Sequence, residues 1–104
     1  MQGHFAIYPP PPVAAIRQNI QRFCALGLQV QITELDVDDD DPLAQRRIFR
    51  DVASACAAEP CCTGVTTWGV TDKYHWRGME ALAFDAEYEP KLAYFGLRDA
   101  LAGR

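Results

Sequence analysis

Residues 28–35 read Leu28-Gln29-Val30-Gln31-Ile32-Thr33-Glu34-Leu35, a run in which apolar and polar side chains alternate. A period of two residues predicts a β-strand, with aliphatic side chains on one face and Gln29, Gln31 and Thr33 on the other. Since only Leu35 separates Glu34 from Asp36, the two acids should point the same way, and we expect them on the face of Ile32.

Helical patterns flank this strand on both sides. Apolar residues recur at helical spacing from Val13, after a rigid proline run, and Gly27 is expected to end the first helix. Asp41 followed by Pro42 predicts the start of a second helix, because aspartate caps helices and proline fits their first position. The expected buried positions of the two helices are Ile16, Ile20 and Phe23, and Ile48, Val52, Ala55 and Cys56.

The rest of the chain continues this alternation of elements. Residues 64–70, Gly-Val-Thr-Thr-Trp-Gly-Val, are a β-branched run bounded by glycines, which predicts a buried strand. A loop then leads to a last helix that opens at Pro90 and buries Leu92, Phe95 and Leu101, and a strand remnant is expected at residues 1–5. Strands separated by helices indicate an α/β fold with a parallel sheet. A complete (β/α)8 barrel needs about 250 residues, so the chain has the length of three of its eight units.

Composition and charge exclude several classes of protein. The 104 residues are 49% hydrophobic and 23% charged, which is typical of one globular domain rather than a disordered chain. The net charge of −4, with ten scattered lysines and arginines, offers no basic surface for nucleic acid. No apolar run approaches the roughly 18 residues of a membrane span, and residues 1–15 lack the pattern of a signal peptide.

The four cysteines are Cys24, Cys56, Cys61 and Cys62. They include no C-x-x-C pair, so a zinc site is not expected. A local disulfide in an oxidising compartment is the favoured interpretation, and four reduced, apolar thiols are the alternative. The aspartates at 36, 38 and 40 alternate like a calcium loop, but Asp41 stands where glycine is needed and Arg47 where glutamate is needed. No metal and no other cofactor is therefore expected.

Glu34 lies at the carboxyl end of its predicted strand, where a barrel gathers its catalytic side chains. Such a carboxylate, taken alone, is most often a solvated loop acid. His4 ends the preceding strand and Trp68 the following one, and this combination favours a sugar site. The carboxylate would attack the anomeric carbon, the imidazole would hold it ionised and oriented, and the indole would stack on the sugar.

Four segments carry a family resemblance, in order and with natural spacing. They are residues 1–4 (Met-Gln-Gly-His), 32–37 (Ile-Thr-Glu-Leu-Asp-Val), 64–76 (from Gly-Val-Thr-Thr-Trp to Tyr-His-Trp) and 84–94 (Phe-Asp to Tyr). They resemble the sixth-strand end, the nucleophile strand, the final strand with its loop, and the start of the last helix of glycoside hydrolase family 10. The resemblance covers residues 1–104 and implies the C-terminal part of a (β/α)8 TIM barrel, from the end of strand 6 through helix 8.

By matched position, the resemblance implies a retaining endo-1,4-β-xylanase that cleaves internal bonds of xylan. Glu34 would be the nucleophile, His4 would bind it, and Asp36 would fix the imidazole. Gln2, Trp68 and Trp76 would contact the sugar.

The resemblance also implies a Cys56–Cys62 disulfide, with Cys61 as a possible competitor for Cys56, and a secreted protein. Cys24 is expected to be a free core thiol.

The acid/base residue of the family, an Asn-Glu pair ending the fourth strand, has no counterpart among the other glutamates, Glu59, Glu80, Glu87 and Glu89. That strand would precede Met1, so we expect a chain that lacks the N-terminal strands and is close to inactive alone. One alternative is a non-catalytic fragment that binds sugar through Trp68 and Trp76, pairs its open sheet with a partner, or self-associates. Another is a barrel glycosidase that acts on β-glucans.

Overall fold

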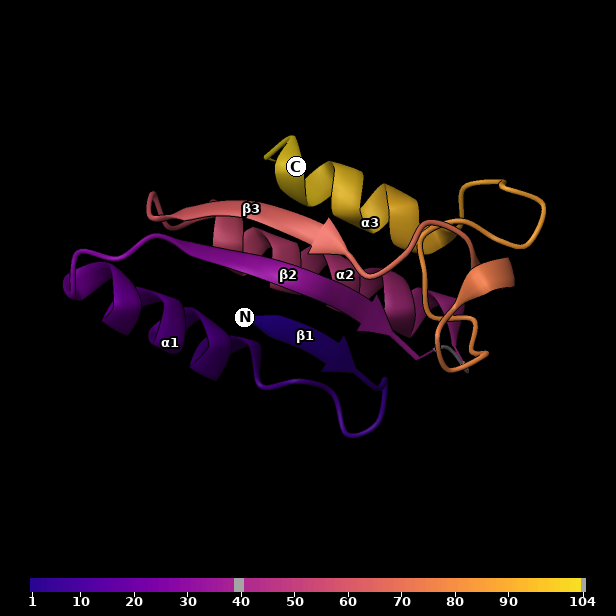
Figure 1. The fold of residues 1–104 in the computed structure, drawn as a ribbon, viewed down its shortest axis with the longest axis horizontal. Helices are drawn as coiled ribbons and strands as arrows, with labels where there is room; N and C mark the ends of the chain where they lie inside the picture. Colours follow the sequence, from indigo (N-terminus) through magenta and orange to yellow (C-terminus); the bar gives the residue numbers. More distant parts are fainter. Residues whose placement is uncertain (39–40, 104) are drawn as a thin grey trace.

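The computed structural model describes residues 1–38 and 41–103, which form one three-stranded parallel sheet with three helices. The strands β1 (Gln2–Phe5), β2 (Val30–Val37) and β3 (Cys62–Thr67) lie side by side in chain order (Figure 1). Helices α1 (Val13–Ala25) and α2 (Pro42–Ala57) join consecutive strands. A loop with the 3-10 helix η1 (Asp72–Tyr74) leads to α3 (Leu92–Leu101). The predicted order of elements and the parallel sheet are confirmed.

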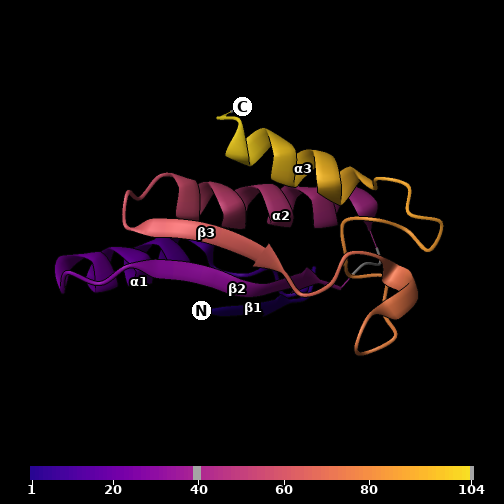
Figure 2. The same cartoon turned by 45° about the horizontal axis from the view of Figure 1, so that its top comes forward.

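Helices α1 and α2 pack against one face of the sheet, and α3 packs on α2 rather than on the strands (Figure 2). The N-terminus of α2 forms as predicted, because the Asp41 carboxylate accepts hydrogen bonds from the backbone N–H groups of Leu43 and Ala44. The opposite face of the sheet carries no helix among the described residues. Parallel sheets are normally covered on both faces, so this face resembles the inner side of an open barrel.

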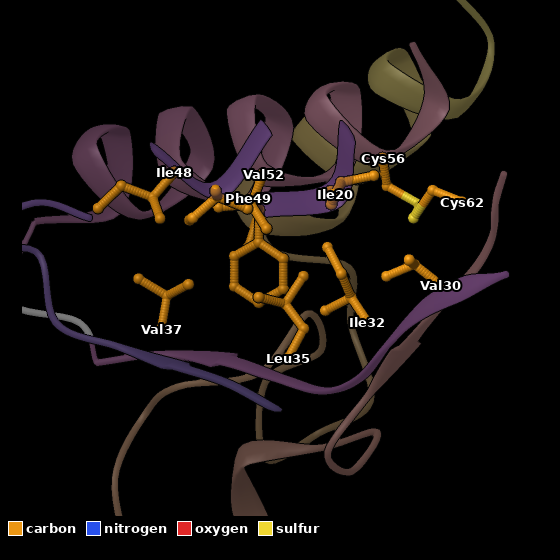
Figure 3. Packing of buried hydrophobic residues seen from close by; sticks show 12 residues of the cluster. Ile20, Val30, Ile32, Leu35, Val37, Ile48, Phe49, Val52, Cys56 and Cys62 are labelled. Carbon is orange, nitrogen blue, oxygen red and sulfur yellow. A yellow bond between two sulfur atoms is a disulfide. The ribbon is translucent and has the colours of Figure 1, made fainter. Parts of the chain in front are cut away.

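The core lies between the sheet and α1 and α2 (Figure 3). Phe49 of α2, Leu35 of β2 and Ile20 of α1 are fully buried and belong to one hydrophobic cluster. Since burial of such side chains supplies most of the folding free energy, this layer sets the position of β2 relative to the helices.

β2 departs from the predicted alternation at the point where the polar residues begin. Ile32 lies in the core as expected, but so do Leu35 and Val37, and the pairing with β3 is irregular between Ile32 and Leu35. The two acids are therefore on the face opposite Ile32, which corrects the expectation from the strand pattern. The irregularity shifts the alternation by one residue, so apolar side chains continue into the core while Glu34 and Asp36 point the other way.

Several boundaries and buried positions differ from prediction. β2 covers Val30–Val37 rather than residues 28–35, β3 begins at Cys62 rather than at residue 64, and Phe23 of α1, expected in the core, is 42% exposed. β3 ends at Thr67 rather than at residue 70, because Gly69 has a positive φ of 125° that a strand cannot contain. Helix α3 begins at Leu92 rather than Pro90, since Pro90 bridges to Phe84. Its buried residues are Ala93, Gly96 and Ala100, whereas the predicted Leu92 and Leu101 are exposed.

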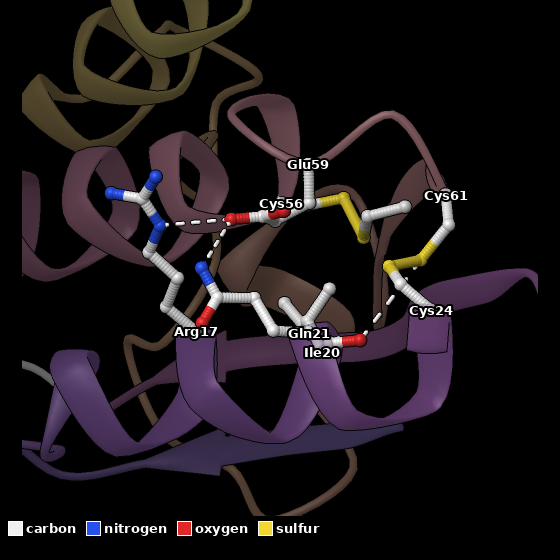
Figure 4. The surroundings of a disulfide bond; sticks show 8 residues. Arg17, Ile20, Gln21, Cys24, Cys56, Glu59 and Cys61 are labelled. Carbon is white, nitrogen blue, oxygen red and sulfur yellow. Dashed lines mark hydrogen bonds and ion pairs between the residues drawn. A yellow bond between two sulfur atoms is a disulfide. The ribbon is translucent and has the colours of Figure 1, made fainter. Parts of the chain in front are cut away.

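Both disulfides lie at the end of the sheet where β2 and β3 begin. The predicted Cys56–Cys62 disulfide is present. Cys24 was expected to be a free thiol, and this prediction is wrong. It forms a disulfide with Cys61 (Figure 4). The adjacent cysteines that precede and open β3 are thus tied to the last turns of α1 and α2, so Cys61 does not compete for Cys56. Nearby, Glu59 accepts hydrogen bonds from Arg17 and Gln21 of α1.

Candidate active site

The candidate site lies at the carboxyl ends of β1 and β2, the opposite end from the disulfides. The parallel register aligns Gln2 with Glu34 and His4 with Asp36. The sequence thus predicts correctly that these side chains belong to neighbouring strand ends. Gln2 is exposed beside Glu34, and Glu34 and His4 are each 21% exposed at the side chain.

His4 joins the two acids by one hydrogen bond at each ring nitrogen. Its Nε2 lies 3.0 Å from Oε2 of Glu34, and its Nδ1 lies 2.8 Å from Oδ1 of Asp36. A ring placed between two carboxylates donates from both nitrogens when it is protonated. The bond holds Oε2 of Glu34, which leaves Oε1 of the same carboxylate for contact with a ligand.

Asp36 is completely buried and binds residues from two separate parts of the chain. Besides His4, it accepts hydrogen bonds on Oδ2 from His75 Nε2 at 2.9 Å and from Trp76 Nε1 at 2.8 Å. The guanidinium of Arg77 lies 3.8 Å from its Oδ1. A buried carboxylate is stable only when donors surround it, and this one has donors on both oxygens.

These contacts shift the pKa values of two members of the site. Burial works against the charged form of His4, but the hydrogen bonds to Asp36 and Glu34 prevail and raise the pKa of His4 above 6.5. Burial also opposes ionisation of Asp36, yet the hydrogen bonds from His75, Trp76 and His4 lower the pKa of Asp36 below 3.8. The site therefore favours a carboxylate at Asp36 beside a readily protonated His4.

Two exposed tryptophans lie in the segment that follows β3. Trp68 follows the end of β3 with 45% of its surface exposed, and Trp76 in the following loop is 58% exposed. Trp76 lies 5.4 Å from the His4 ring, and Arg77 lies over its indole at 4.8 Å. Gly69 is required after Trp68, because a Cβ there would lie 2.8 Å from Leu82 Cδ1 in addition to its positive φ. Exposed indoles beside ionised groups suit the apolar faces and hydroxyl edges of a sugar.

The comparisons with known proteins agree with this geometry. Residues 1–100 match the family described as Glycosyl hydrolase family 10. The chain belongs to glycosyl hydrolase family 10. Endo-1,4-beta-xylanase B of Neocallimastix patriciarum is 38% identical over 104 aligned positions, 97% of this chain but 12% of that protein. Crystal structures of xylanase 10B from Thermotoga maritima and Thermotoga petrophila RKU-1 are 30% and 32% identical, and both have a TM-score of 0.89. Each matches 98% of this chain and 35% of its own chain.

The family 10 chain thus spans about a third of the two Thermotoga xylanases that it resembles. Its three parallel strands are a partial (β/α)8 barrel, not a closed one, as the sequence predicts. Among the described residues, no helix is long and apolar enough to cross a membrane.

His75 was not predicted to be a member of this site. It lies in the segment that carries the resemblance, but nothing in the local pattern shows that it is buried against Asp36. Arg77 was also given no role, although it lies on Trp76 and near Asp36. The aspartate run examined for calcium includes residues 39 and 40, which lie outside the described residues. Across the described part of the chain, no cluster of three metal-binding side chains is present.

Proposed function

We propose that this chain is the nucleophile-bearing, C-terminal part of a retaining endo-1,4-β-xylanase, from strand 6 through helix 8 of the barrel. The observation that carries the proposal is the hydrogen-bonded series Glu34–His4–Asp36 at the strand ends, flanked by exposed Trp68 and Trp76. Membership of family 10 supports it, and so does the complex of the Thermotoga petrophila xylanase with xylobiose. The proposed substrate is xylan.

In the proposed reaction, Glu34 attacks the anomeric carbon and forms a glycosyl-enzyme, which water then hydrolyses with net retention. His4 holds one oxygen of Glu34 at 3.0 Å, so the other oxygen makes the attack. Asp36 fixes the orientation of the imidazole from its far side. Gln2, Trp68 and Trp76 would contact the sugar, Gln2 from its position in register with Glu34.

A second carboxyl group must protonate the leaving oxygen, and in retaining enzymes it lies about 5–5.5 Å from the nucleophile. Glu59 is at the opposite end of the sheet, where it binds Arg17 and Gln21. Glu87 and Glu89 belong to a turn in which their N–H groups bind Asp85. We therefore propose that the acid/base residue is supplied by another part of the barrel and that this chain alone does not hydrolyse xylan at an enzymatic rate.

A chimera tests the nucleophile directly. In it, this chain replaces the matching 35% of the Thermotoga maritima xylanase 10B, whose remaining part would supply the acid/base group. The chimera should release oligosaccharides from xylan, with the β-anomer formed first by proton NMR. Glu34→Gln should abolish release, while Asp51→Asn on the exposed side of α2 should not. An active Glu34→Gln chimera would refute the role of Glu34.

The isolated chain provides the second arm of the test. It should release no sugar under conditions in which the chimera is active. Release by the isolated chain at the rate of the chimera would show that the acid/base residue is present within it.

The exposed tryptophans also favour a second candidate, a non-catalytic fragment that binds sugar. Titration with xylopentaose, followed by tryptophan fluorescence, separates the two. If the chain only binds sugar, the Glu34→Gln variant should bind xylopentaose with unchanged affinity. The chimera should then be inactive even with Glu34 intact.

We also propose a secreted protein and a partner for the open sheet. All four cysteines are in disulfides, which form and persist in oxidising compartments. Strands β1 and β3 each have one unpaired edge in the described sheet, and such edges attract further strands. The remaining strands of the barrel are the proposed partner, with self-association of the chain as the alternative in their absence. Size-exclusion chromatography of the isolated chain measures its self-association.

A further inference from the structure

His75 lies in the loop that follows β3, and its side chain has no exposed surface. Its ring makes contacts at both nitrogens. Nε2 lies 2.9 Å from Oδ2 of Asp36, while Nδ1 lies 3.3 Å from the backbone nitrogen of Arg77 and 3.2 Å from that of Met79.

These contacts define which nitrogen carries the hydrogen. A backbone N–H can only donate, so the two N–H groups of Arg77 and Met79 require a lone pair on Nδ1 of His75. The carboxylate of Asp36 can only accept, so it requires a hydrogen on Nε2. One neutral tautomer, with the hydrogen on Nε2, satisfies all three partners. A doubly protonated ring would direct its Nδ1–H against two other donors.

His75 is thereby connected to the nucleophile through Asp36. Oδ2 of Asp36 accepts from both His75 and Trp76, and its Oδ1 accepts from His4, which binds Glu34. The position of the buried carboxylate therefore depends on a residue of the loop, and the position of His4 depends on the carboxylate.

We propose that His75 is a positioning residue, which as the neutral Nε2–H tautomer fixes the Trp76 loop and the Asp36 carboxylate in one arrangement. It holds the loop by accepting from the backbone of residues 77 and 79, and it holds Asp36 by donating. The inference rests on the proposed function, because the arrangement matters for catalysis only if Glu34 is the nucleophile.

The tautomer is measured by nitrogen-15 NMR of the ring nitrogens in this 104-residue chain. The chain has only two histidines and two tryptophans, so His4→Gln and Trp68→Phe assign every signal. At about pH 7, Nδ1 of His75 should resonate as an unprotonated nitrogen and Nε2 as a protonated one. A hydrogen on Nδ1, or on both nitrogens, overturns the proposal.

Two substitutions separate the two functions of the ring. The side-chain nitrogen of glutamine reaches the position of Nε2, so His75→Gln keeps the donor to Asp36 and loses the acceptor for the loop. The oxygen of asparagine reaches the position of Nδ1, so His75→Asn keeps the acceptor and loses the donor. His75→Asn should therefore change the ring signals of His4 and speed solvent exchange of the Trp76 indole N–H about tenfold. His75→Gln should instead speed exchange of the backbone N–H of Arg77 and Met79 by about the same factor.

Trp68 is the internal control, because its indole is not among the donors to Asp36 and its exchange should stay constant in both variants. A residue that only fills space would give the same response in both variants, and that result would overturn the proposal. If a variant fails to fold, the tautomer of the unmodified chain still decides. The predicted tautomer can be refuted while the Glu34→Gln chimera is inactive as expected. Equally, an active Glu34→Gln chimera can refute the role of Glu34 while the tautomer is as predicted, so the two proposals are tested separately.

Discussion

Asp36→Asn is the substitution that tests the site most directly, because it changes one atom of a buried side chain. The carboxylate accepts three hydrogen bonds, from His4, His75 and Trp76. Asparagine has a single acceptor oxygen. If this oxygen serves the two donors that share Oδ2, the amide nitrogen faces His4.

The magnitude follows from these bonds. One charge-assisted hydrogen bond, contributing about 2 kcal/mol, is lost, and two others weaken by about 1 kcal/mol each on becoming neutral. Relief from burying a charge offsets part of this sum. We expect Asp36→Asn to lower the free energy of unfolding by about 3 kcal/mol. Urea denaturation followed by fluorescence should then show a midpoint about 1.5 M lower.

Asp51→Asn is the matched control, because it makes the same Asp-to-Asn change at a carboxylate that pairs with Arg50 on the exposed side of α2. Exposed pairs contribute little, so its midpoint should move by no more than about 0.3 M. A loss below about 1 kcal/mol for Asp36→Asn, or equal losses in both variants, would refute the view that Asp36 holds the site together.

The pH dependence gives an independent check with a definite sign. The pKa of Asp36 is lowered in the folded chain, so the folded state binds its proton less readily than the unfolded state does. The stability due to the carboxylate is therefore complete above its unfolded pKa and is lost as the pH falls through the lower folded value. Since asparagine does not titrate, the difference between the two proteins should shrink below about pH 3.8. A difference that stays constant would mean that charge is not its cause.

Three further predictions concern the frame around the site and its one raised pKa. The stabilisation by a disulfide grows with the length of the loop that it closes. Replacing Cys24 and Cys61 by serine opens a loop of 37 residues and should lower the free energy of unfolding by about 4 kcal/mol. Replacing Cys56 and Cys62, which are 6 residues apart, should lower it by about 2 kcal/mol, and urea unfolding measures both. Gly96→Ala should cost about 2 kcal/mol, because its Cβ would lie 2.5 Å from a carbonyl oxygen of α2, whereas Gly64→Ala, with 3.8 Å to its nearest neighbour, should cost clearly less by the same measurement. The pKa of His4 is raised, so its contribution to stability is complete below about pH 6.5 and is lost as the pH rises through the folded pKa. The free energy of unfolding should therefore decline between about pH 6 and pH 9, and this decline should be absent in His4→Gln.

Most of the fold was predictable because its signals are local. A capping aspartate before a proline and a glycine after a helix act within a few residues, and those boundaries were correct. The parallel order of strands then brought His4, Glu34 and Asp36 together without any knowledge of their contacts. The change of face within β2 was not predicted, although the apolar positions shift from 28, 30 and 32 to 35 and 37.

The errors have a common physical origin in the packing of distant elements. Leucines were expected to face the core from α3, but α3 lies so close to α2 at Gly96 that only small residues fit between them. Cys24 pairs with a cysteine 37 residues away, and His75 with an acid 39 residues away. Such pairings depend on how whole helices and strands pack in space, and a local sequence pattern does not specify that packing.

The contacts of Asp36 show which parts of the chain support the proposed nucleophile, Glu34. Among the described residues, the side chains that hydrogen-bond Asp36 are His4 of β1 and His75 and Trp76 of the loop after β3. The side-chain hydrogen bond of Glu34 with His4 is thus supported from within this chain. We propose that protonation of the leaving group does require the other strands of a barrel, since Glu59 lies at the opposite end of the sheet and Glu87 and Glu89 belong to the turn at Asp85. Retaining hydrolysis assigns attack and protonation to two different carboxyl groups, and we propose that this chain supplies the first of them.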